Sequence, residues 1–277
     1  MISFSSRLRA SRAIPSAQLP VSNSRIPLRI FQTWKSKLLP PDFARWSNTW
    51  RSHHPGSTWV LQDDAENRLY IKQRFGFFLP TYDRYPREIF RADAIRYFQL
   101  FDFGGLYADM DFECLRSLAP LFNAHCDAAV FGRVVADESW EHAVPNALMF
   151  SAQPQHLFWL FCIHRLWAAC PSNGSVLEAT GPVFLSRALR DYRQWGTARV
   201  MEQCRGIAAE IGARPASIAA GPTVTLEPNA LYPLAWCDPA FRRLSAIARA
   251  RANSCNAAAF PRSYAITYWT NTWRESP

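Results

Sequence analysis

Hydrophobic positions in the first third of the chain alternate between the spacing of strands and the spacing of helices. Residues 27–34 and 59–61 are short apolar runs that end in polar residues, and they predict buried strands. Residues 43–53 carry apolar side chains at helical spacing, and residues 66–75 are predicted to form a second helix. A stronger helix is predicted over residues 87–101, because its apolar positions form a stripe at helical periodicity.

A glycine pair at residues 104–105 ends this helix, and the apolar strand at residues 106–108 leads directly into Asp109-Met110-Asp111. Alternating strands and helices predict an α/β fold, with a Rossmann-like, mostly parallel central sheet flanked by helices. In such sheets ligands bind beyond the carboxyl ends of the strands. Three predicted strands end in polar clusters, at residues 32–33, 62–64 and 109–111. We therefore expect these clusters to converge on one cleft.

The second half of the chain has weaker patterns. Strands are predicted at residues 146–150 and 264–269, and a buried helix at residues 155–169. A turn containing Thr180-Gly181-Pro182 precedes another helix, whereas the Ala-rich residues 196–220 are ambiguous.

Composition and charge narrow the class of protein. The seven cysteines are scattered without a C-x-x-C pair, so reduced thiols are expected and a zinc site or disulfide framework is not. The net charge of +9 suits nucleic acid, an anionic membrane or an anionic small molecule, but no nucleic-acid-reading module is visible. No apolar run is long enough to span a bilayer. Residues 1–24 are Ser- and Arg-rich and are expected to be a flexible basic leader, with a targeting or secretion signal as the alternative.

Asp109 and Asp111 are the candidate metal ligands. They stand two apart at the end of a strand, and residues i and i+2 of an extended chain point the same way, so both carboxylates can address one ligand. Two hard oxygen donors suit Mg²⁺ or Mn²⁺, which also takes phosphate oxygens. Such a cation stabilises the charge that develops on the departing diphosphate of a nucleotide-sugar. An Asp-x-Asp triplet is common on surface loops, so its neighbours decide its meaning.

Arg91, Asp93 and Arg96 lie on the preceding helix. Arg91 and Asp93 fall on different helical faces and are expected to have different roles. Arg96 follows Asp93 by three residues, so one interpretation is a helix salt bridge of little energetic weight. The alternative is that Arg96 reaches the diphosphate and Asp93 reaches a sugar hydroxyl.

The run FRADAIRY at residues 90–97, followed by GGLYADMD at residues 104–111, resembles the sugar-binding region of the DXD glycosyltransferases of family 32. That family includes fungal α-mannosyltransferases and inositol-phosphoceramide mannosyltransferases. Further blocks of the family are similar to residues 26–34, Trp59 with Asp63-Asp64, Asn146, Thr180-Gly181-Pro182 and residues 264–273, so the resemblance covers about residues 25–273.

The resemblance implies a GT-A fold, a UDP- or GDP-hexose donor, Mn²⁺ or Mg²⁺, and retention of anomeric configuration. It implies one GT-A domain over residues 25–277, with a nucleotide-sugar-binding half at 25–125 and an acceptor-side half at 126–277. Carried over position by position, Gln32, Thr33 and Trp34 line the nucleotide pocket.

In the same way, the resemblance assigns Asp93 and Arg96 to the donor sugar and diphosphate, and Tyr107 to the diphosphate or base side. It assigns Asp109 to the ribose or to the metal through water, and Asp111 to the metal directly. Asp109, Asp111 and Arg96 are then the catalytic candidates. The sugar pocket is assigned to Thr180, Gly181 and Pro182.

Two positions depart from the family pattern. Phe31 replaces a His that is frequent in the first strand, and Thr267 stands where a His that can ligate metal is frequent near the C-terminus. A hydroxyl is a poorer ligand than an imidazole, so Asn271 or a water is expected to substitute. An inactive relative that acts as a partner subunit is the alternative that this departure raises.

Sequence order places Glu138, Glu141 and His142 on the acceptor side, but an exposed loop is the favoured interpretation of them. Trp140 beside them either stacks on a sugar or belongs to the core. No residue stands out as a catalytic acid or base. The expected protein is a cytoplasmic hexosyltransferase, with peripheral membrane association as an extension. Its hexose, with mannose favoured, goes to a glycan, lipid or protein acceptor. The alternative within this class is a secreted effector that glycosylates a host protein.

Overall fold

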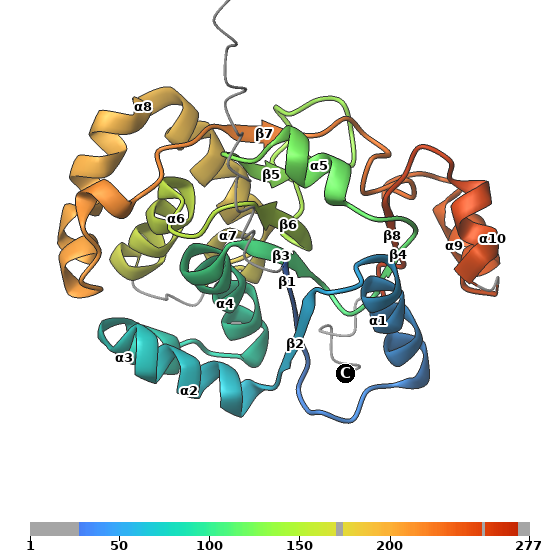
Figure 1. Cartoon of the computed structure of the whole chain (residues 1–277), viewed down its shortest axis with the longest axis horizontal. Helices are drawn as coiled ribbons and strands as arrows, with labels where there is room; N and C mark the ends of the chain where they lie inside the picture. The colour runs from blue at the N-terminus through green and yellow to red at the C-terminus, as the bar shows by residue number, and fades with distance from the viewer. Residues whose placement is uncertain (1–27, 170–173, 251–252, 271–277) are drawn as a thin grey trace, which may run out of the picture.

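The structure is a computed structural model that describes residues 28–169, 174–250 and 253–270. The expected leader at residues 1–24 and the candidate ligand Asn271 lie outside these residues. A six-stranded sheet with the order β2-β1-β3-β6-β5-β7 forms the centre (Figure 1). Of its six strands, β6 runs antiparallel to both neighbours and the other five share one direction. The strands are β1 Arg29–Thr33, β2 Thr58–Gln62, β3 Gly105–Ala108, β5 Ala129–Phe131, β6 Leu148–Ser151 and β7 Thr223–Thr225.

A second, two-stranded antiparallel sheet pairs β4 (Phe112–Cys114) with β8 (Ala265–Thr267). It joins the segment just after the Asp-x-Asp triplet to the C-terminal part of the described chain. The expected α/β class with a mostly parallel sheet flanked by helices is confirmed. The helices, with two 3₁₀ turns, are α1 Pro41–His53, α2 Asp64–Arg74, η1 Gly76–Phe78, α3 Leu79–Asp83, α4 Glu88–Phe103, α5 Ala119–Ala124, α6 Leu157–Ala168, α7 Val176–Ala179, α8 Pro182–Glu210, η2 Pro215–Ser217, α9 Phe241–Ala250 and α10 Asn253–Ala259.

Side chains of the sheet alternate between two hydrophobic cores, as the period of two along a strand requires. Phe31 of β1 and Tyr107 of β3 point into the first core, which α2, α4, α6 and α8 cover. Their neighbours Ile30 and Leu106 point into the second core, where α1 and α5 pack. The inner strands β1, β3, β5 and β6 are thus buried on both faces, which explains why their sequences read as short continuous apolar runs.

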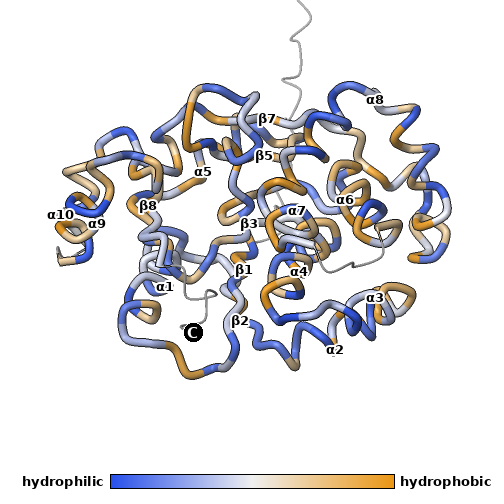
Figure 2. The backbone as a smooth tube through the Cα atoms, turned by 180° about the vertical axis from the view of Figure 1, so that it is seen from behind, coloured by the Kyte–Doolittle hydropathy of each residue, from blue (hydrophilic) through white to orange (hydrophobic). Residues whose placement is uncertain are grey.

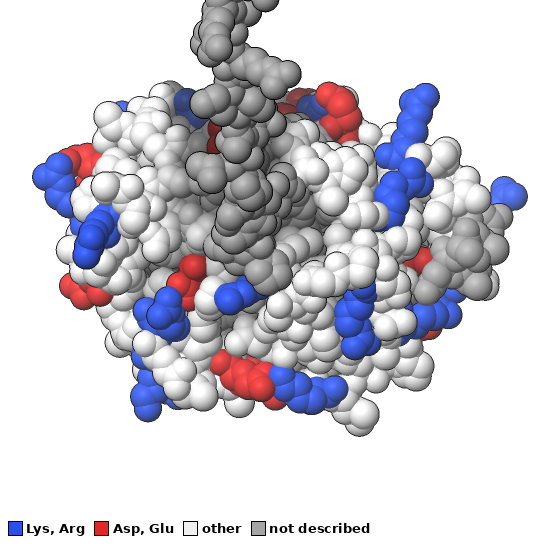
Figure 3. Space-filling model, viewed as in Figure 1, with Lys and Arg blue, Asp and Glu red and all other residues white. Residues whose placement is uncertain are grey.

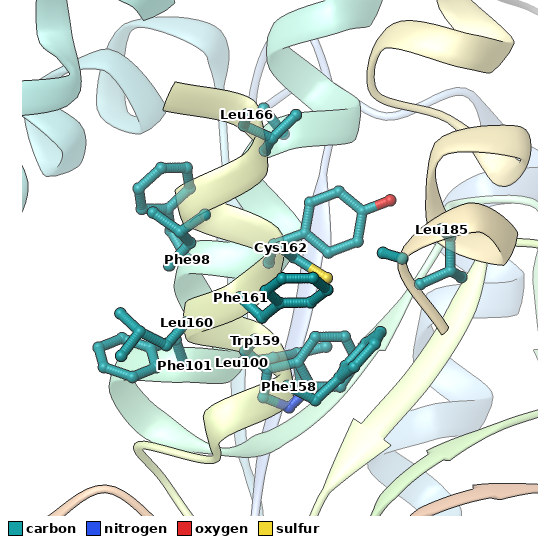
Figure 4. Close-up of a cluster of buried hydrophobic side chains, with 14 of the residues drawn as sticks. Phe98, Leu100, Phe101, Phe158, Trp159, Leu160, Phe161, Cys162, Leu166 and Leu185 are labelled. Atoms are coloured by element: carbon teal, nitrogen blue, oxygen red, sulfur yellow. The ribbon is translucent and has the colours of Figure 1, made fainter. Parts of the chain in front are cut away.

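Helices α4 and α6 form the centre of the first core (Figure 4). Phe98 and Phe101 of α4 lie on the same side of α6 as Leu160, whereas Phe161 of α6 and Leu185 of α8 lie on the other side, where Phe161 packs on Tyr192 and Trp195 of α8. The first five of these side chains are at most 3% exposed. This packing fixes the axis of α4, which carries Asp93 and Arg96. Figure 2 shows hydrophobic and hydrophilic positions alternating along α8, whose two helical segments meet at Gly196.

The glycine pair after α4 has two separate roles. Gly104 is the C-cap of the helix with φ of +62°, a conformation that favours glycine. Gly105 has φ of +88°, and a Cβ there would lie 2.4 Å from the backbone oxygen of Arg29. Only a residue without a side chain therefore lets β3 pair closely with β1.

The elements predicted in the first half form within a few residues of their expected bounds. In the second half, the ambiguous residues 196–220 continue α8 to Glu210 and then form η2. Strands β5 and β7, three residues each, were not predicted. Among the described residues no helix is both long and apolar enough to cross a membrane. On the face shown in Figure 3, Lys and Arg side chains of the described residues are scattered and several lie beside Asp and Glu.

Candidate active site at the Asp-x-Asp turn

The Asp-x-Asp triplet forms a tight turn between β3 and β4. Strand β3 ends at Ala108, and the backbone N–H of Phe112 donates to the carbonyl oxygen of Asp109 at 3.2 Å. The backbone N–H of Asp109 donates to the carbonyl of Ala147 at 2.8 Å. The expectation that Asp109 and Asp111 lie in extended chain was therefore wrong. A turn, not strand alternation, decides where the two carboxylates point, and each has its own set of partners.

The carboxylate of Asp109 is held on one side by two partners. The hydroxyl of Tyr107 donates to its Oδ1 at 2.9 Å, and a guanidinium nitrogen of Arg96 lies 3.3 Å from the same oxygen. Burial raises the pKa of Asp109 above its usual range, whereas the charge of Arg96 opposes that rise. About a third of the side chain (34%) remains exposed. Within the described residues these contacts engage Oδ1, which leaves Oδ2 to accept a ligand.

Asp111 is anchored by the C-terminal segment. Its Oδ2 accepts hydrogen bonds from the backbone N–H of Thr270 at 2.8 Å and from the Thr270 hydroxyl at 3.1 Å. Its Oδ1 accepts from the hydroxyl of Thr267 at 3.3 Å. Burial raises the pKa of Asp111, and the hydrogen bonds from Thr270 and Thr267 counter this effect. Thr267 therefore lies beside Asp111, at the position where the family pattern has a His.

Arg96 is the centre of a buried polar network. Its side chain is 3% exposed, and a guanidinium nitrogen lies 2.8 Å from Asp93. The planar guanidinium lies over the ring of Tyr107, with its Cζ 4.4 Å from the ring centroid. It also donates to the carbonyl oxygen of Asn146 at 2.7 Å. The predicted helix pair of Asp93 and Arg96 is confirmed, but it is buried rather than a surface pair of little weight. Because Arg96 is so deeply buried, it contacts the Asp-x-Asp turn through the carboxylate of Asp109.

Asp93 connects this network to the start of α8. The amide of Asn146 donates to its Oδ1 at 3.1 Å, and the hydroxyl of Thr180 lies 3.5 Å from its Oδ2. A Cβ on Gly181 would come within 3.2 Å of that same oxygen and 3.0 Å of Leu177. Pro182 follows at the first turn of α8, where its missing N–H costs nothing. The triplet Thr180-Gly181-Pro182 thus lies beside Asp93.

Gln32 and Thr33 lie at the carboxyl end of β1 but are already engaged with protein. The Gln32 amide donates to the carbonyl of Asp109 at 3.3 Å and accepts from the indole N–H of Trp59 at 2.9 Å. The Thr33 hydroxyl donates to the Gln62 carbonyl at 3.0 Å. Both are buried, whereas Trp34 is half-buried and packs edge-on against Phe43. These bonds place the ends of β1, β2 and β3 at one edge of the sheet, and the cleft expected there stays a prediction.

Arg91 has a structural role, which separates it from Asp93 as expected. Its guanidinium donates to the carbonyl oxygens of Tyr82, Asp83 and Tyr85 at 3.0, 3.1 and 2.7 Å. It also lies 2.6 Å from Glu88. Arg91 therefore ties the start of α4 to the turn that precedes it.

The sequence assigned no role in the site to several residues that hold it, although Asn146 and Trp59 stand in blocks that resemble the family. Asn146 bridges Arg96 and Asp93, Trp59 fixes Gln32, and the Tyr232 hydroxyl accepts the backbone N–H of Leu148 at 3.1 Å. Their partners are distant in the chain, so no local pattern reveals them. Thr270 lies within the C-terminal aromatic block, where only its resemblance to the family could have pointed to it.

The side-chain atoms around the turn that could ligate a divalent cation are oxygens. Among the described residues no group of three or more His, Cys, Asp or Glu side chains is placed to hold a metal. Two carboxylates and the hydroxyls of Thr267 and Thr270 are all hard oxygen donors. They fit Mg²⁺ or Mn²⁺, which keep several waters and take phosphate oxygens as further ligands.

Comparison with known proteins agrees with this site. Residues 40–128 match the family described as a glycosyltransferase sugar-binding region containing a DXD motif. Mannosyl phosphorylinositol ceramide synthase CSH1 of Saccharomyces cerevisiae is 32% identical over 189 residues, which are 64% of this chain and 47% of that protein. Inositol phosphoceramide mannosyltransferase 3 of Schizosaccharomyces pombe is 33% identical over 189 residues, which are 65% of this chain and 51% of that protein.

Residues 40–128 are therefore similar to the sugar-binding region of DXD glycosyltransferases, as the sequence resemblance implied. The chain spans about half the length of these two curated relatives, of which one is named a mannosyltransferase and the other a mannosyl phosphorylinositol ceramide synthase. The solved structure of the PaToxG glycosyltransferase is 13% identical, with a TM-score of 0.44 over 68% of this chain and 79% of that chain.

Proposed function

We propose that this protein is a metal-dependent, retaining glycosyltransferase that transfers a hexose from a nucleotide-sugar. The observation that carries the proposal is the Asp109–Asp111 turn at the carboxyl edge of the parallel strands, with Arg96 bonded to Asp109 from behind. Ligands bind at this edge in α/β sheets. The match of residues 40–128 to a sugar-binding region supports the same assignment.

Asp111 and Asp109 would hold Mn²⁺ or Mg²⁺, which supplies a positive charge where the departing diphosphate gains negative charge. Tyr107 and Arg96 hold Asp109 through its Oδ1, and Asp111 is oriented by Thr267 and Thr270. Both carboxylates are thus held in place before any ligand arrives, which limits the reorganisation needed on binding. Asn271, which follows Thr270, is a further candidate oxygen donor.

The roles of the remaining residues follow from their exposure. Asp93 and Arg96 are almost completely buried, so we propose that they position Asp109 and shape the floor of the donor site. Gln32 and Thr33 hold the strand edge together, and Trp34 presents a half-buried ring beside them for the nucleotide. Tyr107 orients Asp109 through its hydroxyl, and Thr180, Gly181 and Pro182 close the side of the site next to Asp93.

Mannose is the proposed hexose, because one relative is named a mannosyltransferase and the other is named as the synthase of a mannosylated lipid. Both act, by name, on inositol phosphoceramide or form its mannosylated product, so a glycan or lipid headgroup is the proposed acceptor. These relatives extend well beyond the matched region, and acceptor choice belongs to the loops around the site.

Hydrolysis of a panel of UDP- and GDP-hexoses with Mn²⁺ tests the proposal. We expect one donor, GDP-mannose foremost, to be hydrolysed in the presence of Mn²⁺ and not after chelation with EDTA. Asp111→Asn should abolish this hydrolysis, whereas Asp42→Asn, at an exposed acid on α1, should leave it unchanged. Hydrolysis that is equal in the two variants, or that resists EDTA, contradicts the site.

Thr267 favours one competing function, a catalytically inactive partner subunit. Its hydroxyl occupies the position next to Asp111 where an imidazole could ligate metal, and it is 1% exposed. That function predicts binding of a nucleoside diphosphate without hydrolysis of any donor in the panel.

A further inference from the structure

Three aromatic rings gather on the molecular surface beyond the Asp-x-Asp turn. The rings of Trp140 and Trp236 lie 5.4 Å apart between centroids, and His142 lies 5.5 Å from Trp140 and 6.3 Å from Trp236. Trp236 is 43% exposed, and the other two rings are half-buried. We call Trp140, His142 and Trp236 the aromatic platform. Burial in the core explains Trp140 in part, since it packs against both cores, but it does not explain the exposed face of Trp236.

The loop that carries Trp140 is held by ion pairs on both sides. Arg187 of α8 donates to both oxygens of Glu141 at 2.9 and 3.2 Å. Glu138 receives Arg193 at 2.9 Å and Arg133 at 3.1 Å. These clamps fix the backbone on either side of Trp140, so the indole is presented in a set position. A ring held in advance binds a ligand at a lower entropic cost than a mobile one.

Both segments of the platform are bonded to the Asp-x-Asp site within a few residues. Downstream of His142, the carbonyl of Ala147 accepts the N–H of Asp109 at 2.8 Å. Trp236 lies two residues after Leu234, which is a Cα distance of at most about 7 Å. The carbonyl of Leu234 accepts the indole N–H of Trp269 at 2.7 Å. The backbone N–H of Thr270, the residue after Trp269, donates to Asp111. The platform therefore lies on two segments that are both hydrogen-bonded to the parts of the chain that hold the Asp-x-Asp turn.

We propose that the aromatic platform is the acceptor subsite, which binds the C–H face of a six-membered polyhydroxylated ring. This proposal rests on the proposed glycosyltransferase function. Such rings, whether the pyranose of a glycan or the cyclitol of a lipid headgroup, present one apolar face of C–H groups and an edge of hydroxyls. An indole covers the apolar face with a large, rigid surface and without a charge. Stacking on Trp236 would place the ring hydroxyls towards the donor site.

Saturation-transfer NMR without donor tests this subsite independently of catalysis. The probes are methyl α-D-mannopyranoside and myo-inositol, which separate a glycan acceptor from a cyclitol acceptor. We expect the wild-type protein to bind at least one of them, and Trp236→Ala to weaken that binding roughly tenfold. Trp236→Phe should retain most of it. Trp167→Ala is the matched control, because Trp167 is similarly exposed (40%) but is not part of the platform. Trp167 lies in α6, and its ring packs on Phe77 of η1.

The variants also separate this proposal from the donor site. Trp236→Ala should hydrolyse the donor at the wild-type rate while its KM for the acceptor probe in transfer assays rises about tenfold. The proposed subsite is wrong if the wild-type protein binds neither probe, or if Trp236→Ala and Trp167→Ala bind the probes equally well. If the probes bind as expected but no donor is hydrolysed with Mn²⁺, the proposed function fails and the carbohydrate-binding platform stands.

Discussion

A guanidinium nitrogen of Arg96 lies 3.3 Å from Oδ1 of Asp109, and this contact joins the buried helix α4 to the first acid of the Asp-x-Asp turn. Arg96 itself is 3% exposed and also lies 2.8 Å from Asp93. One buried cation therefore contacts two carboxylates from different elements. Loss of that cation leaves buried charge without a partner, so the contact is as important for folding as for the site.

Arg96→Met is expected to lower the free energy of unfolding by about 3–5 kcal/mol, because it strands Asp93 in the interior. Urea unfolding followed by circular dichroism measures the loss. Arg96→Lys keeps the charge but not the planar guanidinium, so its free energy of unfolding should lie between those of the wild-type protein and Arg96→Met. Arg68→Met is the control: Arg68 forms a well-aligned but exposed pair with Asp83 at 2.7 Å, and its loss should be much smaller. Equal effects of Arg96→Met and Arg68→Met would contradict the buried network.

Gly105→Ala is expected to destabilise the protein by roughly 2–4 kcal/mol, because alanine is strained at positive φ and its Cβ meets the Arg29 carbonyl oxygen. The separation of β1 from β3 moves Gln32 away from the Asp109 carbonyl, so nucleotide affinity should fall as well. Gly206→Ala is the matched control. Gly206 lies within α8 with no atom near its Cβ position, and alanine there should stabilise the helix by about 0.5–1 kcal/mol. Thermal unfolding of the two variants distinguishes the predictions.

His156 is expected to make stability depend on pH. It is fully buried, and its Nδ1 accepts the backbone N–H of Phe158 at 3.2 Å at the start of α6. Burial lowers its pKa to about 4. A neutral His156 therefore stabilises the fold fully above about pH 6.5, the ordinary value, and this contribution is lost as the pH falls towards 4. The total is on the order of 3 kcal/mol.

Urea unfolding at pH 7.5, 6 and 5 measures this dependence. His156→Asn keeps an oxygen that can accept at the helix start but does not titrate, so its stability should change less over the same range. A slope that is identical in the wild-type protein and in His156→Asn would show that another group carries the dependence.

The sequence was sufficient for most of the first half of the fold. The apolar runs at β1 and β2 and the apolar stripe on α4 are strong local signals, and the glycine pair after α4 indicated where that helix ends. Strands β5 and β7 have three residues each, so neither offers a period long enough to read. The extent of α8 was missed because Gly196 interrupts its pattern while tertiary packing continues the helix.

For the site, the sequence identified the acids but not their surroundings. Asp109 and Asp111 were expected to share a direction along a strand, whereas the bond from Phe112 to Asp109 bends them into a turn. The partners of Arg96 and Asp111 include Asn146 and Thr270, which lie 50 and 159 residues away in the chain. Contacts of that range depend on how α4, β6 and the C-terminal segment pack together, and no local pattern contains them.

Binding of Mn²⁺ with a nucleoside diphosphate tests the metal site most directly. Electron paramagnetic resonance of free Mn²⁺, titrated with protein in the presence of GDP or UDP, counts the bound ion. The wild-type protein and Asp42→Asn should each bind one ion per chain with one of the nucleotides, and Asp111→Asn should bind it at least about tenfold more weakly. Equal Mn²⁺ binding by Asp111→Asn and wild type, or none by wild type with either nucleotide, would contradict the assignment of the Asp109–Asp111 turn.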